Sequence, residues 1–341
     1  MPNATDTPFI KQTTNLYINM PKNAPLVAIY TLVYNHAPFL RDYFEGVIAQ
    51  QTNFPFIAVV HDDCSTDGST DIIREYAEKY PQIIKPIYEE VNCYQNDLWD
   101  QVIVKMRAAY KDAKYIAFCE GDDYWTDPLK LQKQVDLLEQ HPEYAFCCHR
   151  YRIIHESDHS ISSDYAQDFF KDGEDLVVTQ ELQSRTWLTK VLTMVIRVDL
   201  YIQAFDEAKR KYGNECLDTC IFYELLKLGN GIALNQFMGM YRQQNNGIWS
   251  RLNLTQKARS NYQVLEMLYE NNRDDKYILQ SLQHNAIHYV RFLSCWNTKN
   301  WPIFKHIYAY MNSSKLKTNA ILSFILPVGL IQATKKLFNK C

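Results

Sequence analysis

Short apolar runs alternate with amphipathic stretches over the first two thirds of the chain. The apolar runs predict strands at 26–32, 56–60, 83–88, 115–119 and 144–148. The amphipathic stretches between them predict helices at 38–49, 71–80, 98–110 and 128–140. Strands that alternate with helices in this way are typical of a mostly parallel sheet covered by helices on both faces.

The pattern changes further along the chain. Residues 155–174 are polar and irregular, which predicts a surface loop, and 188–196 is an apolar strand candidate. Short strands are expected at 232–234 and 237–241, and helices at 199–211, 218–228, 254–270, 276–295, 303–311 and 320–339. We therefore predict three parts: a polar lead-in (1–24), an α/β domain (25–250) and a helical C-terminal region (251–341).

Composition narrows the class of protein. Hydrophobic residues make up 47% of the 341 positions and the net charge is −3, so a globular protein is expected and a nucleic-acid partner is not. The nine cysteines are odd in number and scattered without a C-x-x-C pair, which predicts reduced thiols in the cytoplasm. The first residues lack a signal-peptide pattern, and no stretch reaches the ~18 apolar residues of a spanning helix.

An acidic turn at 61–70 follows the predicted strand at 56–60. Its sequence is His-Asp-Asp-Cys-Ser-Thr-Asp-Gly-Ser-Thr, so carboxylates, hydroxyls and a glycine stand where a buried strand meets a helix. Ligands bind at such strand ends in open α/β sheets, and Asp63 can accept a hydrogen bond from a nucleobase or ribose. A capped turn with Gly68 at positive φ explains the same residues without a ligand. A calcium loop does not fit, because Arg74 stands where the bidentate glutamate is needed.

A second acidic turn, Glu120-Gly121-Asp122-Asp123, follows the predicted strand at 115–119. Three carboxylates within four residues repel one another unless a cation lies between them. Mg²⁺ and Mn²⁺ prefer carboxylate oxygens and commonly share them with substrate phosphates. The turn is therefore a candidate metal site, with a solvated acidic turn as the alternative.

These residues resemble the family-2 glycosyltransferases, which have the GT-A fold. The resemblance covers about 26–250 and rests on the opening strand that ends in Tyr-Asn (27–35), the helix-ending Gln-Thr (48–52) and the two acidic turns. The second turn with Tyr124-Trp125, followed by Lys-Leu-Gln-Lys-Gln at 130–134, is similar to the metal-binding motif of a bacterial polysaccharide-type subgroup. The fold class expected is thus a nucleotide-diphospho-sugar transferase α/β fold with a helical extension.

The resemblance also implies roles for individual residues. Asp123 would be the main ligand of the metal, and Asp122 would lie near both the metal and the ribose. Asp63 would contact the base. The rest of the expected nucleotide-sugar pocket consists of Thr31, Tyr34, Asn35, Asp62 and Arg242.

A general base must take the proton from the acceptor hydroxyl. The family places it where a helix opens, and Asp218 matches that context, with Glu215 as the runner-up. Asp218 also suits a plain N-cap. Arg242 suits either a phosphate contact or a structural ion pair, and Gln244 replaces a histidine that relatives often carry.

The function predicted is inverting, metal-dependent transfer of a sugar from a nucleotide sugar, with a UDP-sugar favoured. The acceptor would be a hydroxyl of a glycan or a lipid-linked saccharide in cell-surface polysaccharide biosynthesis. One alternative is a non-catalytic nucleotide-sugar-binding or scaffold subunit. Another, a nucleotidyltransferase, is disfavoured because the first strand is not followed by a Gly-rich loop bearing Lys or Arg.

The C-terminal tail allows two interpretations. Residues 320–331 are apolar and flanked by lysines, which suits an interfacial helix at 320–339 on the inner face of an anionic membrane. Packing onto the catalytic domain, or a dimer contact, is the alternative. The oligomeric state, the donor sugar and the choice between Mn²⁺ and Mg²⁺ stay open.

Overall fold

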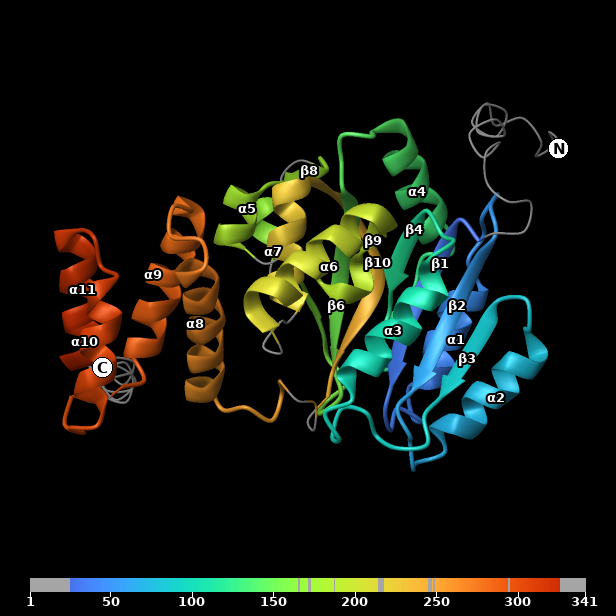
Figure 1. Cartoon of the computed structure of the whole chain (residues 1–341), viewed down its shortest axis with the longest axis horizontal. Helices are drawn as coiled ribbons and strands as arrows, with labels where there is room; N and C mark the ends of the chain where they lie inside the picture. The colour runs from blue at the N-terminus through green and yellow to red at the C-terminus, as the bar shows by residue number, and fades with distance from the viewer. Residues whose placement is uncertain are drawn as a thin grey trace, which may run out of the picture.

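A computed structural model describes residues 25–325, except 165, 171–172, 187, 214–217, 245–246, 248 and 294. The predictions for 1–24, for Glu215 and for most of 320–339 fall outside these residues. Figure 1 shows an α/β body with its sheet in the middle and a set of C-terminal helices at the far end from the N-terminal strands.

One sheet runs through the α/β body, and its strands are β1 (Val27–Val33), β2 (Phe56–Asp62), β3 (Ile84–Tyr88), β4 (Tyr115–Phe118), β5 (Tyr124–Trp125), β6 (Phe146–His155), β7 (Ile161–Ser163), β8 (Leu176–Val178), β9 (Val195–Arg197) and β10 (Gly231–Gln243). The spatial order is β3-β2-β1-β4-β9-β6-β10-β5, with β7 beside β6 and β8 beside β10. The four strands from β3 to β4 are all parallel, as predicted. The other half is mixed, because β9 runs antiparallel to both β4 and β6 while β10 is parallel to β6.

Helices cover both faces of this sheet, as the alternating pattern predicted (Figure 1). Their bounds are α1 (Leu40–Ile48), α2 (Ser69–Lys79), α3 (Trp99–Tyr110), α4 (Lys130–Gln140), α5 (Gln180–Arg185), α6 (Val198–Tyr212) and α7 (Asp218–Leu228). Strand β1 shows the two layers: Ala28 and Tyr30 join a core with α3 and α6, whereas Ile29 and Val33 join a core with α1 and α4. Successive strand residues point to opposite faces, so both faces of β1 are buried.

Several sequence predictions differ from the structure, and three of them concern the stretch from 155 to 243. The apolar stretch 188–196 is a 3₁₀ turn (Val191–Thr193) followed by the short strand β9, not one strand. The strands expected at 232–234 and 237–241 form the single strand β10, whose register with β6 shifts between Leu234 and Gly239. The loop expected at 155–174 contains β7, whose exposed edge position leaves it without the apolar alternation that marks a strand.

The C-terminal helices are α8 (Leu254–Glu270), α9 (Lys276–Val290), α10 (Asn300–Ala309) and α11 (Ser314–Ile325). A capping box at Asn253 opens α8, and the Asp275 side chain caps α9. Asp275 also accepts a hydrogen bond from the Tyr223 hydroxyl of α7 at 2.7 Å, which ties α9 to the α/β body. Among the described residues, we find no helix with the length and apolar character needed to cross a bilayer.

Candidate functional site

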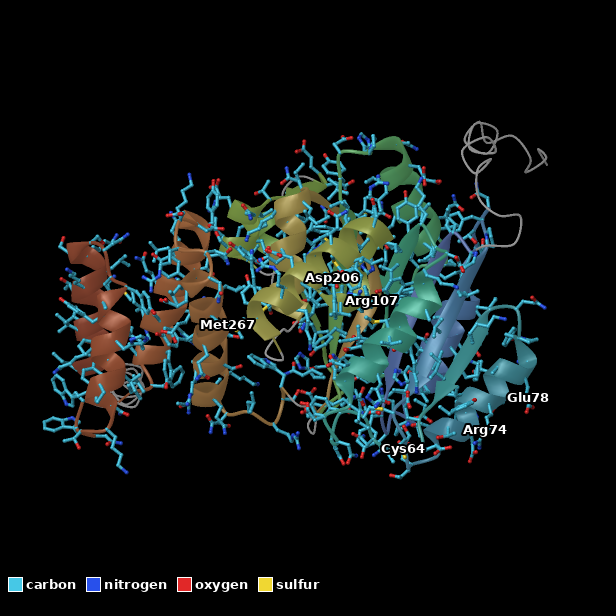
Figure 2. All side chains as sticks on the ribbon, in the orientation of Figure 1. Cys64, Arg74, Glu78, Arg107, Asp206 and Met267 are labelled. Carbon is cyan, nitrogen blue, oxygen red and sulfur yellow. The ribbon has the colours of Figure 1, made fainter. Side chains whose placement is uncertain are left out.

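The carboxyl ends of β1, β2 and β4 meet at one edge of the sheet because these strands are parallel neighbours. Cys64, in the turn after β2, marks this edge in Figure 2. Both acidic turns predicted from the sequence leave the sheet here: one follows β2 and the other follows β4.

Side chains of the 61–70 turn hold the neighbouring β1–α1 turn in place. Ser65 Oγ accepts a hydrogen bond from the Asn35 amide at 2.9 Å, and Asp67 Oδ2 accepts one from the Ala37 amide at 3.0 Å. Asn35 Oδ1 in turn accepts from the Thr66 amide at 2.8 Å. Gly68 has φ 96°, which is the positive φ that the sequence predicted at this glycine. Much of this motif therefore fixes the shape of the sheet edge.

The other two aspartates of this turn, Asp62 and Asp63, are also bonded to the chain itself. Asp62 accepts hydrogen bonds from the Ser65 amide at 3.1 Å and the Thr70 hydroxyl at 2.5 Å. Asp63 accepts from two consecutive amides that precede α3, those of Cys93 at 2.6 Å and Tyr94 at 3.2 Å. Asp63 thus anchors the segment before α3, and its contact with a nucleobase stays a prediction.

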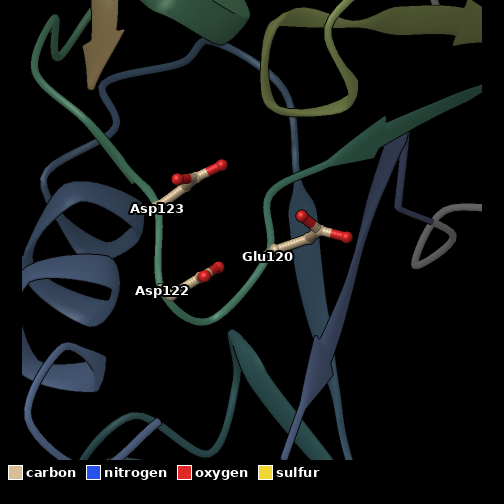
Figure 3. Close-up of side chains that lie close together, drawn as sticks. All are labelled: Glu120, Asp122 and Asp123. Atoms are coloured by element: carbon tan, nitrogen blue, oxygen red, sulfur yellow. The ribbon is translucent and has the colours of Figure 1, made fainter. Parts of the chain in front are cut away.

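The second turn brings three carboxylates together. Glu120, Asp122 and Asp123 each offer an oxygen, and these oxygens all lie within 4.8 Å of one another (Figure 3). Asp123 is buried and its Oδ1 accepts a hydrogen bond from the Arg242 amide at 2.7 Å. Asp122 accepts one from Gln244 Nε2 at 2.6 Å. Gln244 therefore contacts the acidic cluster directly.

The electrostatics of the cluster favour a bound cation. Glu120 is exposed, but desolvation by the neighbouring protein, then the charges of Asp122 and Asp218, raises its pKa. Desolvation, then the charges of Asp122 and Glu120, raises the pKa of Asp123 well above its ordinary value. Carboxylate oxygens crowded in this way fit the ligand preference of Mg²⁺ and Mn²⁺. The donor set therefore suits the metal predicted from the sequence.

Lys190 is a basic residue at this cluster that the sequence did not single out. Its charge lowers the pKa of both Glu120 and Asp123 and so partly offsets their mutual repulsion. Its ammonium lies 4.2 Å from the centre of the Tyr241 ring. Lys190 is about seventy positions from the acidic turn in sequence, so only the fold reveals their proximity.

Arg242 is buried and donates to three different acceptors. Its Nε bonds the Asp122 carbonyl oxygen at 2.8 Å, Nη1 bonds Glu156 Oε1 at 2.5 Å and Nη2 bonds Asp42 Oδ2 at 2.7 Å. The sequence allowed either a phosphate contact or a structural ion pair for Arg242, and the structure shows the ion pair. The guanidinium fixes the backbone of the acidic turn, and its contact with a phosphate stays a prediction.

A cavity of about 470 Å³ opens beside the cluster. Glu120 and Asp218 both line it, together with Tyr30 and Leu32 of β1. Thr31 is fully buried on the opposite face of β1, where its hydroxyl is bonded to that of Tyr43. The expectation that Thr31 lines the pocket does not fit this arrangement, because strand alternation turns its neighbours toward the cavity instead.

A buried hydrogen-bond chain, also absent from the sequence predictions, supports the Tyr30 hydroxyl. His61 Nδ1 lies 2.8 Å from Tyr30 Oη, and His61 Nε2 lies 2.7 Å from Glu89 Oε1. Desolvation acts to raise the pKa of Glu89, but hydrogen bonds from Lys105 and His61 outweigh it and the pKa is lowered. Because ionised Glu89 only accepts, His61 Nε2 donates to it, and in the neutral imidazole Nδ1 is then the acceptor of the Tyr30 hydroxyl.

The remaining predicted residues lie at the same edge. Asp218 is the first residue of α7 and is exposed, and its Oδ1 accepts from the Thr219 amide at 2.7 Å. Asp218 thus lines the cavity and also accepts a hydrogen bond from the first turn of α7, so the two roles predicted for it are compatible. Tyr34 is partly exposed, at 38%, in the turn after β1. Glu215 lies outside the described residues.

The fold and the site together define a class of protein. The arrangement is that of GT-A transferases: S. aureus TarS, solved in complex with UDP, superposes with a TM-score of 0.55 at 14% identity, over 87% of this chain and 86% of that one. Residues 28–191 match the family model for glycosyl transferase family 2. The matched segment, about half of the chain, is thus a domain of this glycosyltransferase family, as the resemblance indicated.

Two curated relatives add detail. An uncharacterised protein of Mycobacterium tuberculosis is 42% identical over 130 residues, which is 38% of this chain and 36% of the relative. The match thus spans about a third of that protein. The putative teichuronic acid biosynthesis glycosyltransferase TuaG of Bacillus subtilis is 27% identical over 229 residues, 66% of this chain and 82% of the relative.

Proposed function

We propose that the chain transfers a sugar from a nucleotide sugar to an acceptor hydroxyl, with inversion and with the help of a divalent metal. One observation carries the proposal: Glu120, which belongs to the acidic cluster, and Asp218 line a single cavity at the carboxyl edge of the sheet. A metal-ligating cluster and a separate carboxylate are the two parts that a single displacement at a sugar carbon needs.

Glu120, Asp122 and Asp123 would hold Mn²⁺ or Mg²⁺, which supplies positive charge opposite the departing diphosphate. Arg242 fixes this turn by bonding the Asp122 carbonyl, and its amide orients the Asp123 carboxylate. Lys190 adds a second positive charge near the cluster. The hydrogen bonds of Arg242 hold the carboxylates in position before any ligand binds, so less reorganisation accompanies the reaction.

Asp218 would act as the general base. It takes the proton from the acceptor hydroxyl, whose oxygen attacks the anomeric carbon from the face opposite the leaving group. Asp218 is exposed and opens a helix, so an incoming hydroxyl can reach its carboxylate. Glu215 remains the second candidate for this role.

The donor we favour is a UDP-sugar, and the acceptor a glycan or lipid-linked saccharide of a cell-surface polysaccharide. TarS is described in complex with UDP, and TuaG is named for teichuronic acid biosynthesis, so both are consistent with these choices. The cavity adds support, because Tyr94, Trp99 and Phe118 line it and aromatic faces suit the apolar faces of sugar rings.

The test compares Asp123→Asn and Asp218→Asn with the wild type. We expect Asp218→Asn to lose transfer by about 10²–10⁴-fold while nucleotide binding persists. Asp123→Asn should lose both transfer and the metal dependence of nucleotide binding. Asp112→Asn is the matched control, because this carboxylate is exposed and does not line the cavity. Full activity in both site variants would overturn the proposal, and wild-type nucleotide binding without turnover would support the scaffold alternative.

A further inference from the structure

The charges of the chain are divided unevenly along its length. Residues 276–341 contain nine Lys or Arg and no Asp or Glu. Since the whole chain has 36 basic and 39 acidic residues, the first 275 residues carry 27 basic and 39 acidic ones. The net charge of −3 is thus the sum of a basic part at 276–341 and an acidic part at 1–275, which contains the α/β body.

The basic part also exposes apolar side chains. On α10 and α11, Trp301 is 45% exposed, Leu322 50% and Ile325 51%. The Trp301 ring packs against that of Phe324, with ring centres 5.2 Å apart, so the start of α10 and the end of α11 lie together. Figure 1 places this helix pair at the far end of the molecule from the N-terminal strands.

The lysines of the same helix pair are exposed as well: they are Lys299, Lys305, Lys315 and Lys317. Tryptophan and aliphatic side chains beside lysines, with no acid among them, match an interfacial membrane site, where rings enter the headgroup layer and ammonium groups meet anionic lipids. A soluble polyanion would leave the apolar side chains in water. A two-fold contact between copies would bring lysines against lysines.

We propose that the α10–α11 pair docks the protein onto an anionic membrane surface. Trp301, Leu322 and Ile325 enter the headgroup region, and the four lysines pair with lipid phosphates. The docking surface lies on different residues from the catalytic site, so either can fail without the other. It also assigns the membrane contact to a helix pair, whereas one of the two interpretations of the sequence assigned it to the single segment 320–339.

The test is cosedimentation of the full chain with vesicles of equal parts phosphatidylglycerol and phosphatidylcholine, and with vesicles of phosphatidylcholine alone. We expect binding to the anionic vesicles only, weakened by high salt because screening shortens electrostatic reach. Lys315→Gln with Lys317→Gln should lower the partition coefficient about fivefold for each lysine removed. Lys111→Gln is the charge-matched control, because Lys111 is exposed on the α/β body.

The apolar contribution is tested by Trp301→Ser with Leu322→Ser, which should lower binding at least about tenfold at either salt concentration. Val104→Ser, at a position 68% exposed on α3, is its control. Equal binding to neutral and anionic vesicles, or no loss in the lysine variant, would overturn the proposal. Two further results would overturn it. One is that a soluble polyanion displaces the protein from the vesicles and that Trp301→Ser with Leu322→Ser does not weaken binding of this polyanion. The other is self-association of the protein that the same serine variant abolishes. If the serine variant does not fold, the variant with Lys315→Gln and Lys317→Gln still tests the proposal, because both of its substitutions lie at exposed positions.

Discussion

Replacing Lys130 by Met should stabilise the protein at neutral pH. Lys130 opens α4 and is fully buried, and its ammonium lies 3.9 Å from the centre of the Trp125 ring. Within the described residues its Nζ has no hydrogen-bond partner. Burial lowers the pKa of Lys130 from 10.5 to about 7, because the charged form loses its hydration. Methionine has a similar length and no charge to desolvate.

The magnitude follows from that difference in pKa. A drop from 10.5 to about 7 corresponds to about 5 kcal/mol against the charged form. The cation–π contact with Trp125, worth up to ~2 kcal/mol when desolvated, acts in the other direction. We therefore expect Lys130→Met to raise the free energy of unfolding by about 3 kcal/mol at pH 7.

The pH dependence supplies the sharper test. Between pH 7 and 10.5 the unfolded chain keeps the Lys130 proton while the folded chain has released it, so wild-type stability rises with pH across this window. The advantage of Lys130→Met, measured by urea unfolding, should shrink over the same range. Lys111→Met, at an exposed position, should show no such trend. A variant less stable than wild type at pH 7, or an advantage independent of pH, would refute the reasoning.

Two further predictions concern packing and the hydrogen-bond chain beneath the cavity. Gly231→Ala would place a Cβ 2.1 Å from a ring atom of buried Phe146, so we expect the free energy of unfolding, measured by thermal unfolding, to fall by about 1–3 kcal/mol. Gly247→Ala is the control, because the nearest atom to its added Cβ would be 3.5 Å away. Equal melting temperatures for the two variants would count against this packing. Glu89→Gln should destabilise the fold above pH 4.5, since the lowered pKa of Glu89 contributes stability there that is lost as pH falls through the folded pKa. Urea unfolding should then show a weaker acid dependence in the variant than in the wild type, and an unchanged acid dependence would mean that the ionised Glu89, bonded to Lys105 and His61, adds no stability.

The sequence predicted the parallel half of the sheet because its strands are buried on both faces and bounded by turn residues. The same feature explains why both acidic turns were found: each one follows such a strand directly, and parallel neighbours bring their ends to one edge. The family could be identified from those residues, and the fold agrees with it.

The details of the pocket could not be predicted in the same way. A strand buried on both faces gives no polar alternation, so nothing in the sequence told Thr31 from its neighbours Tyr30 and Leu32. Lys190 and Glu89 reach the site through contacts between distant segments. The sequence could not decide the role of Arg242, because an arginine that binds phosphate and an arginine in an ion pair have the same sequence signature.

The most direct test of the central claim is Mn²⁺ binding to the wild type and to Asp123→Asn, measured by titration calorimetry with and without UDP. If the acidic cluster holds the metal together with a nucleoside diphosphate, UDP will tighten Mn²⁺ binding in the wild type, and the variant will lose both the binding and the effect of UDP. Equal Mn²⁺ affinity in the two proteins, or wild-type affinity that UDP leaves unchanged, would contradict the account.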